Sequence, residues 1–261
     1  MKKLVVNADD FGFTRDVNQG IVEAHNQGIL TAATLMANGA AFDDAVRLAR
    51  QTPSLDIGVH LVLVGEPPLP PTVAKLALAV ALGRIRIYDE LAAQVRKIVD
   101  AGIRPTHLDT HKHTHLLPPV LEAVARISRD FQIPWVRRPF DLPIAHSGVP
   151  FKIRVTSRAL GLRSGGLATV LARYGCRSTD YFSGFQITGD YDAESLTALI
   201  RALPEGSTEF MCHPGICGGE LRDARTRLKE SRERELRALT SPEVRKALED
   251  SGVVLTNYAG L

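Results

Sequence analysis

The sequence has few cysteines and no long apolar run, and both features narrow the classes of protein to which it can belong. Its three cysteines, Cys176, Cys212 and Cys217, form no CxxC pair, and their odd number argues against a disulfide framework. No stretch approaches the ~18 to 20 apolar residues that cross a bilayer, and Met1 leads straight into a strand pattern without a secretion signal. The sequence therefore predicts a cytoplasmic protein in a reducing compartment.

The chain also lacks an excess of charge of either sign, and it lacks the common nucleotide-binding motifs. Its 261 residues include 32 Lys and Arg against 29 Asp and Glu, a balance that argues against a dedicated nucleic-acid binder. Neither GxGxxG nor a P-loop motif follows a predicted strand. No repeat with a period of roughly 20 to 50 residues is evident, which sets solenoids aside. We expect no nucleic-acid partner.

Buried strand patterns alternate with helical patterns along most of the chain, and this alternation predicts a parallel α/β sheet. Seven or eight strand-helix pairs without an internal linker predict one domain over residues 1–261, folded as a closed or nearly closed (β/α) barrel. A doubly wound open sheet is the alternative. The expected strands lie at residues 2–6, 30–36, 55–64, 106–111, 135–137, 181–187, 210–213 and 253–258.

Two segments interrupt this alternation, and we interpret both as insertions. Residues 65–86 contain a proline-rich turn followed by the apolar run Leu76 to Leu82. Residues 142–179 are expected to be irregular, since they are rich in Gly, Ser and Arg, and they contain no acidic residue. Each insertion follows a predicted strand, so in a barrel both should border the face where the strands end.

Polar side chains gather where four of the predicted strands end, which in a parallel barrel brings them to one face. One carboxylate and two imidazoles form a standard set of ligands for a divalent metal with open positions, so Asp10, His60 and His111 make a plausible metal site. The polar residues at these strand ends are Asp9, Asp10, His60, His107, Asp109, His111, His113, His115 and His213.

Taken singly, each of these residues also has a plainer interpretation. An Asp pair before Phe-Gly is more often a turn or a helix cap than a site. A histidine after a buried strand is often a core or rim residue whose hydrogen bonds are satisfied. Their gathering at one predicted face is harder to attribute to chance than any single residue.

Four sequence blocks, in this order, resemble the YdjC-like carbohydrate deacetylases. They are Asn-Ala-Asp-Asp-Phe-Gly at residues 7–12, Gly-Val-His-Leu at 58–61, Thr-His-Leu-Asp-Thr-His-Lys-His-Thr-His at 106–115 and Met-Cys-His-Pro-Gly at 211–215. That family is similar to the NodB-type polysaccharide deacetylases. The resemblance implies a distorted (β/α) barrel of about seven strands and hydrolysis of the N-acetyl group of an amino sugar.

The resemblance also implies roles for individual residues. It makes Asp10, His60 and His111 the ligands of one divalent metal ion, Asp9 the general base and His213 the general acid. Arg137 stands where the family places an arginine that orients the base, but Arg138 beside it leaves this assignment open. The roles of His107, Asp109, His113 and His115 stay open as well.

Mixed nitrogen and oxygen ligands favour Zn²⁺, with Mn²⁺, Co²⁺ and Ni²⁺ as alternatives, and Mg²⁺ is compatible but less suited. In such a site the metal polarises the acetyl carbonyl and lowers the pKa of a bound water. The sequence does not name the ion.

A narrower resemblance is to the hopanoid-biosynthesis-associated branch of the family, carried by residues 60–64, 226–233 and 241–244. It implies an N-acetylglucosaminyl hopanoid lipid as substrate, with soluble chito-oligosaccharides as the alternative. A metal-dependent phosphoesterase or amidohydrolase on a similar barrel usually opens with His-x-His on its first strand, which is absent here. An inactive sugar- or lipid-binding module would not need Asp9 and His213.

The two insertions combine apolar and basic residues without acids, over residues 67–88 and 142–179. We expect them to form a basic-rimmed apolar platform that makes peripheral contact with the inner face of an anionic membrane. The alternative is that they cover the barrel or form a subunit contact, as in a homodimer. The basic residues concerned are Lys75, Arg84, Arg86, Lys152, Arg154, Arg158, Arg163, Arg173 and Arg177.

Overall fold

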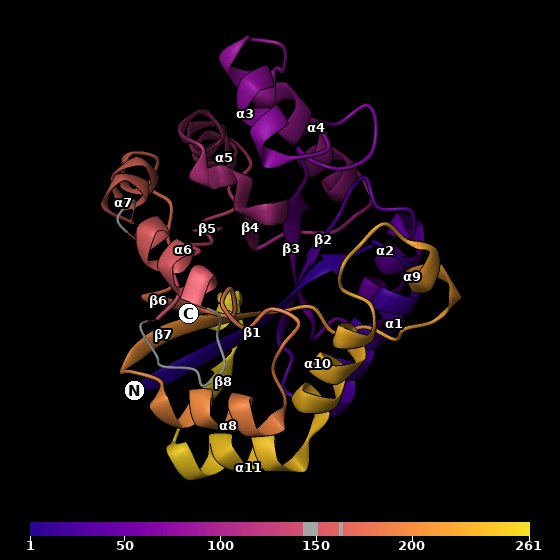
Figure 1. The fold of residues 1–261 in the computed structure, drawn as a ribbon, viewed down its shortest axis with the longest axis vertical. Coiled ribbons are helices and arrows are strands. Elements are labelled where there is room, and N and C mark those ends of the chain that lie inside the picture. Colours follow the sequence, from indigo (N-terminus) through magenta and orange to yellow (C-terminus); the bar gives the residue numbers. More distant parts are fainter. Residues whose placement is uncertain (143–150, 162–163) are drawn as a thin grey trace.

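The computed structural model describes residues 1–142, 151–161 and 164–261, with a curled sheet of parallel strands at its centre (Figure 1). The strands are β1 (Lys2–Phe11), β2 (Ala32–Leu35), β3 (Asp56–Leu61), β4 (His107–Thr110), β5 (Trp135–Val136), β6 (Tyr181–Ser183), β7 (Gly206–Cys212) and β8 (Val254–Thr256). Seven of them follow the order β5-β4-β3-β2-β1-β7-β6, and β8 pairs with β1 beside this path.

The two edges of this sheet meet, which curls it into a distorted barrel. Two isolated parallel bridges connect the end strands with the segments beside them. Trp135 of β5 pairs with Arg177, which precedes β6, and Phe182 of β6 pairs with Asp141, which follows β5. Each bridge is only one residue long, so the closure between β5 and β6 is much weaker than the continuous pairing of β1 with β7. The prediction of a distorted barrel of about seven strands is confirmed.

Helices follow most strands and pack outside the sheet (Figure 1). Helix α1 buries Val17, Ile21 and Ala24, as their spacing predicts, and the Thr14 side chain caps its first turn. The helices that follow the predicted alternation are α1 (Arg15–Gln27), α2 (Phe42–Gln51), α4 (Ile87–Asp100), α5 (Pro118–Asp130), α8 (Ala193–Ala202), α10 (Glu230–Thr240) and α11 (Pro242–Ser251). The sequence did not predict the short helix α9 (Gly219–Asp223) or the 3₁₀ turns η1 (His111–Leu116) and η2 (Tyr258–Gly260).

The insertions contain helices of their own. Residues 65–86 include α3 (Val73–Ala81), and residues 142–179 include α6 (Phe151–Gly161) and α7 (Ser164–Arg173). The expectation that 142–179 is irregular is therefore wrong for α6 and α7, while residues 143–150 and 162–163 lie outside the described residues. Helix α7 forms despite two glycines because Leu167 and Leu171, one turn apart, are both buried.

Strand β1 is the longest strand and the one on which three other strands assemble. All its residues from Leu4 to Phe11 are buried, and it pairs with β2, β7 and β8. It extends five residues beyond the expected end at Val6, so the two aspartates lie within the strand and not after it. Among the described residues, none of the helices has both the length and the apolar character that crossing a membrane requires.

Candidate metal centre

An irregularity at the end of β1 brings both aspartates to one site. Neighbouring residues in a regular strand point to opposite faces, so Asp9 and Asp10 would normally separate. The pairing of β1 with β2 shifts register between Ala8 and Phe11, and Asp10 adopts a positive φ of 68°. Such a bulge changes the direction of a side chain, and aspartate tolerates this backbone region better than most residues.

Asp10, His60 and His111 converge as the sequence predicts. Asp10 Oδ1 lies 3.4 Å from His60 Nε2 and 3.4 Å from His111 Nδ1, and the two imidazole nitrogens are 3.2 Å apart. Ligand atoms about 2.0 to 2.1 Å from a tetrahedral zinc ion lie roughly 3.3 to 3.4 Å from one another. The spacing and chemistry of these three atoms therefore fit a divalent metal ion.

Asp109 holds His60 in the orientation that such a site needs. Its Oδ1 lies 2.6 Å from His60 Nδ1, and the Thr34 hydroxyl donates to its Oδ2 at 3.0 Å. A metal-binding histidine commonly donates its other ring N–H to a carboxylate, which leaves the opposite nitrogen as the ligand. Burial would lower the pKa of His60, but the carboxylates of Asp109, Asp9 and Asp10 outweigh it and raise that pKa to about 9.

Arg137, and not Arg138, contacts Asp9. Its Nη1 and Nη2 donate to the two Asp9 oxygens at 2.8 and 2.7 Å, whereas the half-buried Arg138 donates to a backbone carbonyl. Arg137 also contacts Asp109 at 2.8 Å and Glu209 at 2.6 Å. Burial would raise the pKa of Asp9, but the charge and hydrogen bonds of Arg137 outweigh it and hold that pKa well below its ordinary value.

His213 directly follows β7 and lies beside Asp9. Its Nε2 is 3.9 Å from Asp9 Oδ2, and its backbone N–H donates to Glu235 at 2.5 Å. Its buried Nδ1 has no hydrogen-bond partner among the described residues. Burial lowers the pKa of His213, and the nearby carboxylates of Asp9 and Glu235 compensate only in part.

The three remaining histidines of the 106–115 block do not enter the ligand set. His107 contacts Asn7 and Thr106, and His115 contacts the Thr110 hydroxyl and the Arg137 carbonyl. Both rings are buried, and the pKa of each is held below its ordinary value, first by burial and then by the charge of Arg137. His113 is also buried, 5.6 Å from the Phe185 ring.

Two buried charged residues of α10 reach this site, although the sequence predicted a site role for neither. Arg232 Nη2 donates to Asp10 Oδ2 at 2.5 Å, and Glu235 accepts from the His213 backbone. Helix α10 lies in a stretch whose composition is typical of a charged, solvated helix, so hydrophobic periodicity alone cannot separate these two residues from their exposed neighbours.

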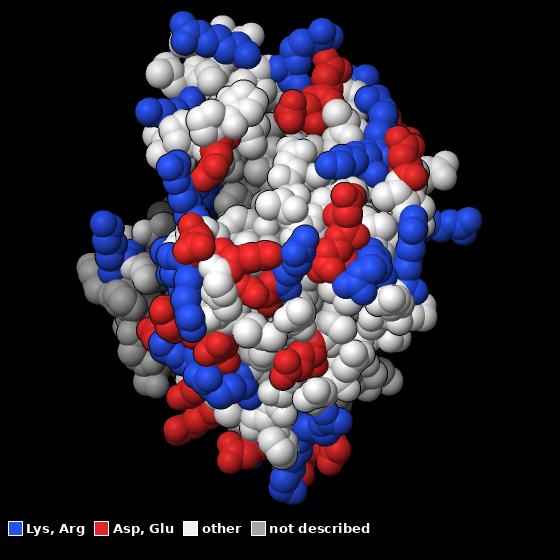
Figure 2. Space-filling view, turned by 90° about the vertical axis from the view of Figure 1, so that its right-hand side faces the viewer, with Lys and Arg blue, Asp and Glu red and all other residues white. Residues whose placement is uncertain are grey.

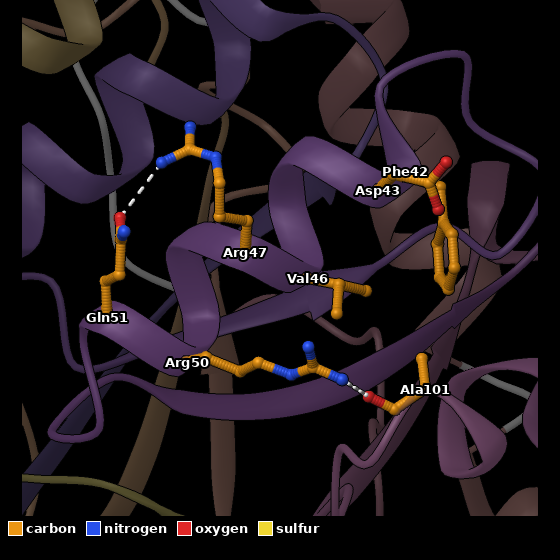
Figure 3. Close-up of a pocket in the computed structure, with 7 residues that line it drawn as sticks. All are labelled: Phe42, Asp43, Val46, Arg47, Arg50, Gln51 and Ala101. Atoms are coloured by element: carbon orange, nitrogen blue, oxygen red, sulfur yellow. Dashed lines mark hydrogen bonds between the residues drawn. The ribbon is translucent and has the colours of Figure 1, made fainter.

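A separate pocket runs along the outer face of α2 and is not part of the metal centre (Figure 3). Two of its lining arginines already have partners, since Arg47 donates to Gln51 and Arg50 donates to the Ala101 carbonyl. None of the six predicted site residues lines it. We assign it no chemistry.

Three comparisons with known proteins agree over the whole chain. A model of the family described as YdjC-like protein matches residues 3–250. A carbohydrate deacetylase of Brevibacillus brevis is 30% identical, over 99% of both chains. A chitooligosaccharide deacetylase of Klebsiella pneumoniae is 34% identical, over 98% of this chain and 97% of the relative.

The fold also resembles solved structures. An Enterococcus faecalis protein, provisionally named as a cellobiose-phosphate cleavage protein, superposes with a TM-score of 0.77 at 28% identity and covers 99% of this chain and 98% of its own. A lactam utilization protein of Thermus thermophilus has a TM-score of 0.53 at 15% identity, over 97% of this chain and 98% of its own, a likeness of fold alone.

Proposed function

This chain belongs to the YdjC-like protein family, and from that premise we propose that it is a metal-dependent deacetylase that hydrolyses the N-acetyl group of an amino sugar. The observation that carries the proposal is the three-atom set of Asp10, His60 and His111, spaced 3.2 to 3.4 Å apart. A carboxylate and an imidazole that the ligand set does not use, those of Asp9 and His213, lie 3.9 Å apart beside it. The names of the two curated deacetylase relatives support the same reaction.

Asp10, His60 and His111 would hold the ion, with Zn²⁺ favoured by the nitrogen and oxygen ligands and Mn²⁺, Co²⁺, Ni²⁺ or Mg²⁺ as the alternatives. When bound, the ion would polarise the acetyl carbonyl and make water a stronger nucleophile. Asp109 would accept a hydrogen bond from His60 Nδ1–H, which leaves His60 Nε2 free to bind the ion.

Asp9 and His213 move the protons. Asp9 takes a proton from the attacking water, and Arg137 keeps both Asp9 oxygens in place for this transfer. His213 receives the proton that Asp9 has accepted and passes it to the departing amine. The water oxygen first forms the new C–O bond to the acetyl carbon, and the amide C–N bond then breaks as the nitrogen takes up the proton from His213. The products are acetate and a free amino sugar.

The test of this proposal is acetate release from N-acetylglucosaminyl compounds by the purified chain. We expect acetate, loss of activity after treatment with a chelator, and recovery when Zn²⁺ is added back. Acetate release that a chelator leaves unchanged would contradict metal dependence, and absence of acetate from every acetylated amino sugar would contradict the reaction itself.

The finer part of the proposal is a lipid-linked substrate, such as an N-acetylglucosaminyl hopanoid, reached at an anionic membrane surface. Helix α3 and the residue after it expose Leu78 and Leu82, at 59% and 53%, and α6 exposes Val155 at 47%. Lys75 and Arg84 are exposed around α3, and Figure 2 shows basic side chains at the end of the molecule where α3 lies. Apolar side chains ringed by basic ones suit an anionic lipid surface.

Co-sedimentation with anionic liposomes tests this part of the proposal. Binding should fall with salt and with the double variant Lys75→Glu, Arg84→Glu, while activity on a short soluble N-acetylglucosaminide survives. Lys246→Glu on α11, also an exposed lysine, is the control and should bind like the wild type. Absence of binding at low salt would contradict the membrane contact. A dimer that buries Leu78 and Leu82 would make this surface a subunit contact instead.

Soluble chito-oligosaccharides are the second candidate substrate, favoured by the name of the Klebsiella pneumoniae relative. The kcat/KM values for N,N′-diacetylchitobiose and for a lipid-linked N-acetylglucosaminide distinguish the two. A higher value for N,N′-diacetylchitobiose would favour the soluble substrate and leave the mechanism unchanged.

A further inference from the structure

Helix α10 carries two fully buried charges among exposed ones. Arg232 and Glu235, one turn apart, are 1% and 0% exposed, whereas Arg234 and Arg237 on the same helix are exposed. The helix packs against α1, which follows the strand that carries Asp10 (Figure 1). Ionised side chains are rarely buried unless their partners compensate for the lost hydration, so each of these two calls for an explanation.

Arg232 is directed at the metal centre. Its Nη2 donates to Asp10 Oδ2 at 2.5 Å, while Asp10 Oδ1 faces His60 and His111. Its Nε donates to the Leu228 carbonyl at 3.3 Å, and its buried Nη1 has no hydrogen-bond partner among the described residues. A buried guanidinium with an unpaired donor is unfavourable for stability, which points to a role in the site.

Glu235 is directed at the loop that carries His213. Its Oε2 accepts from the His213 backbone N–H at 2.5 Å and from the Tyr191 hydroxyl at 3.1 Å. Its Oε1 accepts from the Gly189 backbone N–H at 2.7 Å. One carboxylate therefore ties together two loops that follow neighbouring strands, β6 and β7.

We infer that α10 positions both halves of the reaction centre. Arg232 occupies one oxygen of Asp10 and so makes it a one-oxygen metal ligand, and Glu235 fixes the loop that presents His213. Both act as positioning residues, because Arg232 reaches the centre only through Asp10 and Glu235 only through the His213 backbone. This inference rests on the proposed function but adds to it a role for α10, which lies more than 200 residues after Asp10 in the sequence.

The zinc-induced rise in Tm, together with kcat and KM, tests the role of Arg232. In Arg232→Met the Asp10 charge has lost its partner, so bound zinc should stabilise the variant more than it stabilises the wild type. The kcat of the zinc-loaded variant should fall at least ~10-fold with little change in KM, as for other groups behind a ligand. A zinc-induced rise no larger than in the wild type, or an unchanged kcat, would overturn the role.

Two further variants keep this test decisive. Arg232→Lys keeps the positive charge, so its zinc-induced rise should return to the wild-type value, and a rise as large as that of Arg232→Met contradicts the charge argument. If Arg232→Met does not fold, Arg232→Gln replaces it with the same expectation. Arg237→Met, an exposed arginine on the same helix, is the matched control and should behave like the wild type.

Glu235→Gln should lower kcat as Arg232→Met does, but without the change in zinc response. Because Glu235 contacts no metal ligand, the zinc-induced rise in Tm should equal that of the wild type, while kcat falls at least ~10-fold. Glu230→Gln, an exposed residue of α10, should change neither quantity. An unchanged kcat in Glu235→Gln, or a changed zinc response, would overturn its role.

The zinc measurement needs no substrate, which separates this inference from the proposed function. A wild-type chain that releases no acetate would contradict the proposed reaction, yet the comparison of Arg232→Met with the wild type would still decide whether Arg232 controls Asp10.

Discussion

Asp9 and Asp10 are neighbours in one strand, and each has its own buried arginine, but their surroundings differ. Arg137 serves three carboxylates, those of Asp9, Asp109 and Glu209, and directs both its Nη groups at Asp9. Arg232 serves a single carboxylate and leaves the other Asp10 oxygen facing two imidazoles. On one side an arginine engages both oxygens of its aspartate, and on the other it engages only one.

The different arginine contacts support different roles for Asp9 and Asp10, which the residue type alone does not distinguish. A carboxylate with a free oxygen beside two imidazoles is a ready metal ligand, whereas one held through both oxygens keeps its place next to the ligand set without joining it. We therefore propose that the two adjacent aspartates act as a ligand and a proton acceptor because the fold supplies each with a different cation. The predictions that follow test this separation from the largest expected effect to the smallest.

Removing a ligand should have the largest effect. We expect about one divalent ion per wild-type chain, and His60→Ala, His111→Ala or Asp10→Asn should lose most of the metal and, with it, the activity. Metal analysis after dialysis measures the occupancy. His25→Ala, a histidine outside the site whose ring contacts Ser54, is the control and should keep the ion. Full occupancy in both histidine variants would refute the ligand assignment.

Asp9→Asn should separate the loss of activity from the loss of metal. The ion should stay, because Asp9 is not a ligand, but kcat should fall at least ~10²-fold, the scale on which general acid-base groups contribute. Metal analysis and steady-state kinetics on the same sample measure both. If Asp9→Asn loses its ion as completely as Asp10→Asn, the two aspartates do not have separate roles.

Asp109→Asn should have an intermediate effect, because Asp109 contacts both the metal ligand His60 and Arg137, the partner of Asp9. Its carboxylate holds the His60 ring and also contacts Arg137, so the amide should weaken metal affinity by about 10- to 100-fold without abolishing binding. Competition with a chromogenic chelator measures the affinity. Asp56→Asn, another buried aspartate that contacts Thr106 and Tyr258, is the control. Equal affinities in the two variants would show that Asp109 does not support His60.

Much of the fold follows from local patterns in the sequence. Alternating buried strands and amphipathic helices predicted the parallel barrel, because the periods of 2 and 3.6 residues are written locally. The true end of β1 was missed, since the bulge at Asp9 and Asp10 depends on pairing with β2. Helix α7 was missed because its glycines conceal the burial of Leu167 and Leu171.

The site divides in the same way. Asp10, His60 and His111 lie in the sequence blocks that resemble the family. They were predicted from their positions at strand ends and from that resemblance, and the structure brings them together. Arg232 lies 222 residues from Asp10, in a helix whose other charges mostly face solvent, so its contact with Asp10 could not be predicted from the local sequence. The choice between Arg137 and Arg138 needed the three-dimensional contact with Asp9.

The smallest expected effect concerns Arg137, because its single positive charge cannot neutralise the three carboxylates that it contacts. Burial, with the charges of Asp109 and Asp9, raises the pKa of Glu209 from 4.5 to about 6, and the attraction of Arg137 only partly offsets this. A raised folded-state pKa means that the folded chain binds the proton more tightly than the unfolded one. The resulting stability is fully present below about pH 4.5 and is lost as the pH rises through about 6.

Glu209→Gln imitates the protonated side chain and should remove this part of the pH dependence. Between about pH 4 and 7 the free energy of unfolding of the wild type should fall relative to that of the variant, by up to about 2 kcal/mol for a shift of about 1.5 units. Urea titrations at several pH values measure it, and Glu194→Gln, an exposed residue of α8, should follow the wild type. Parallel curves for the wild type and Glu209→Gln would mean that Arg137 neutralises all three carboxylates, and the contrast with the single pair of Arg232 and Asp10 would then have no electrostatic basis.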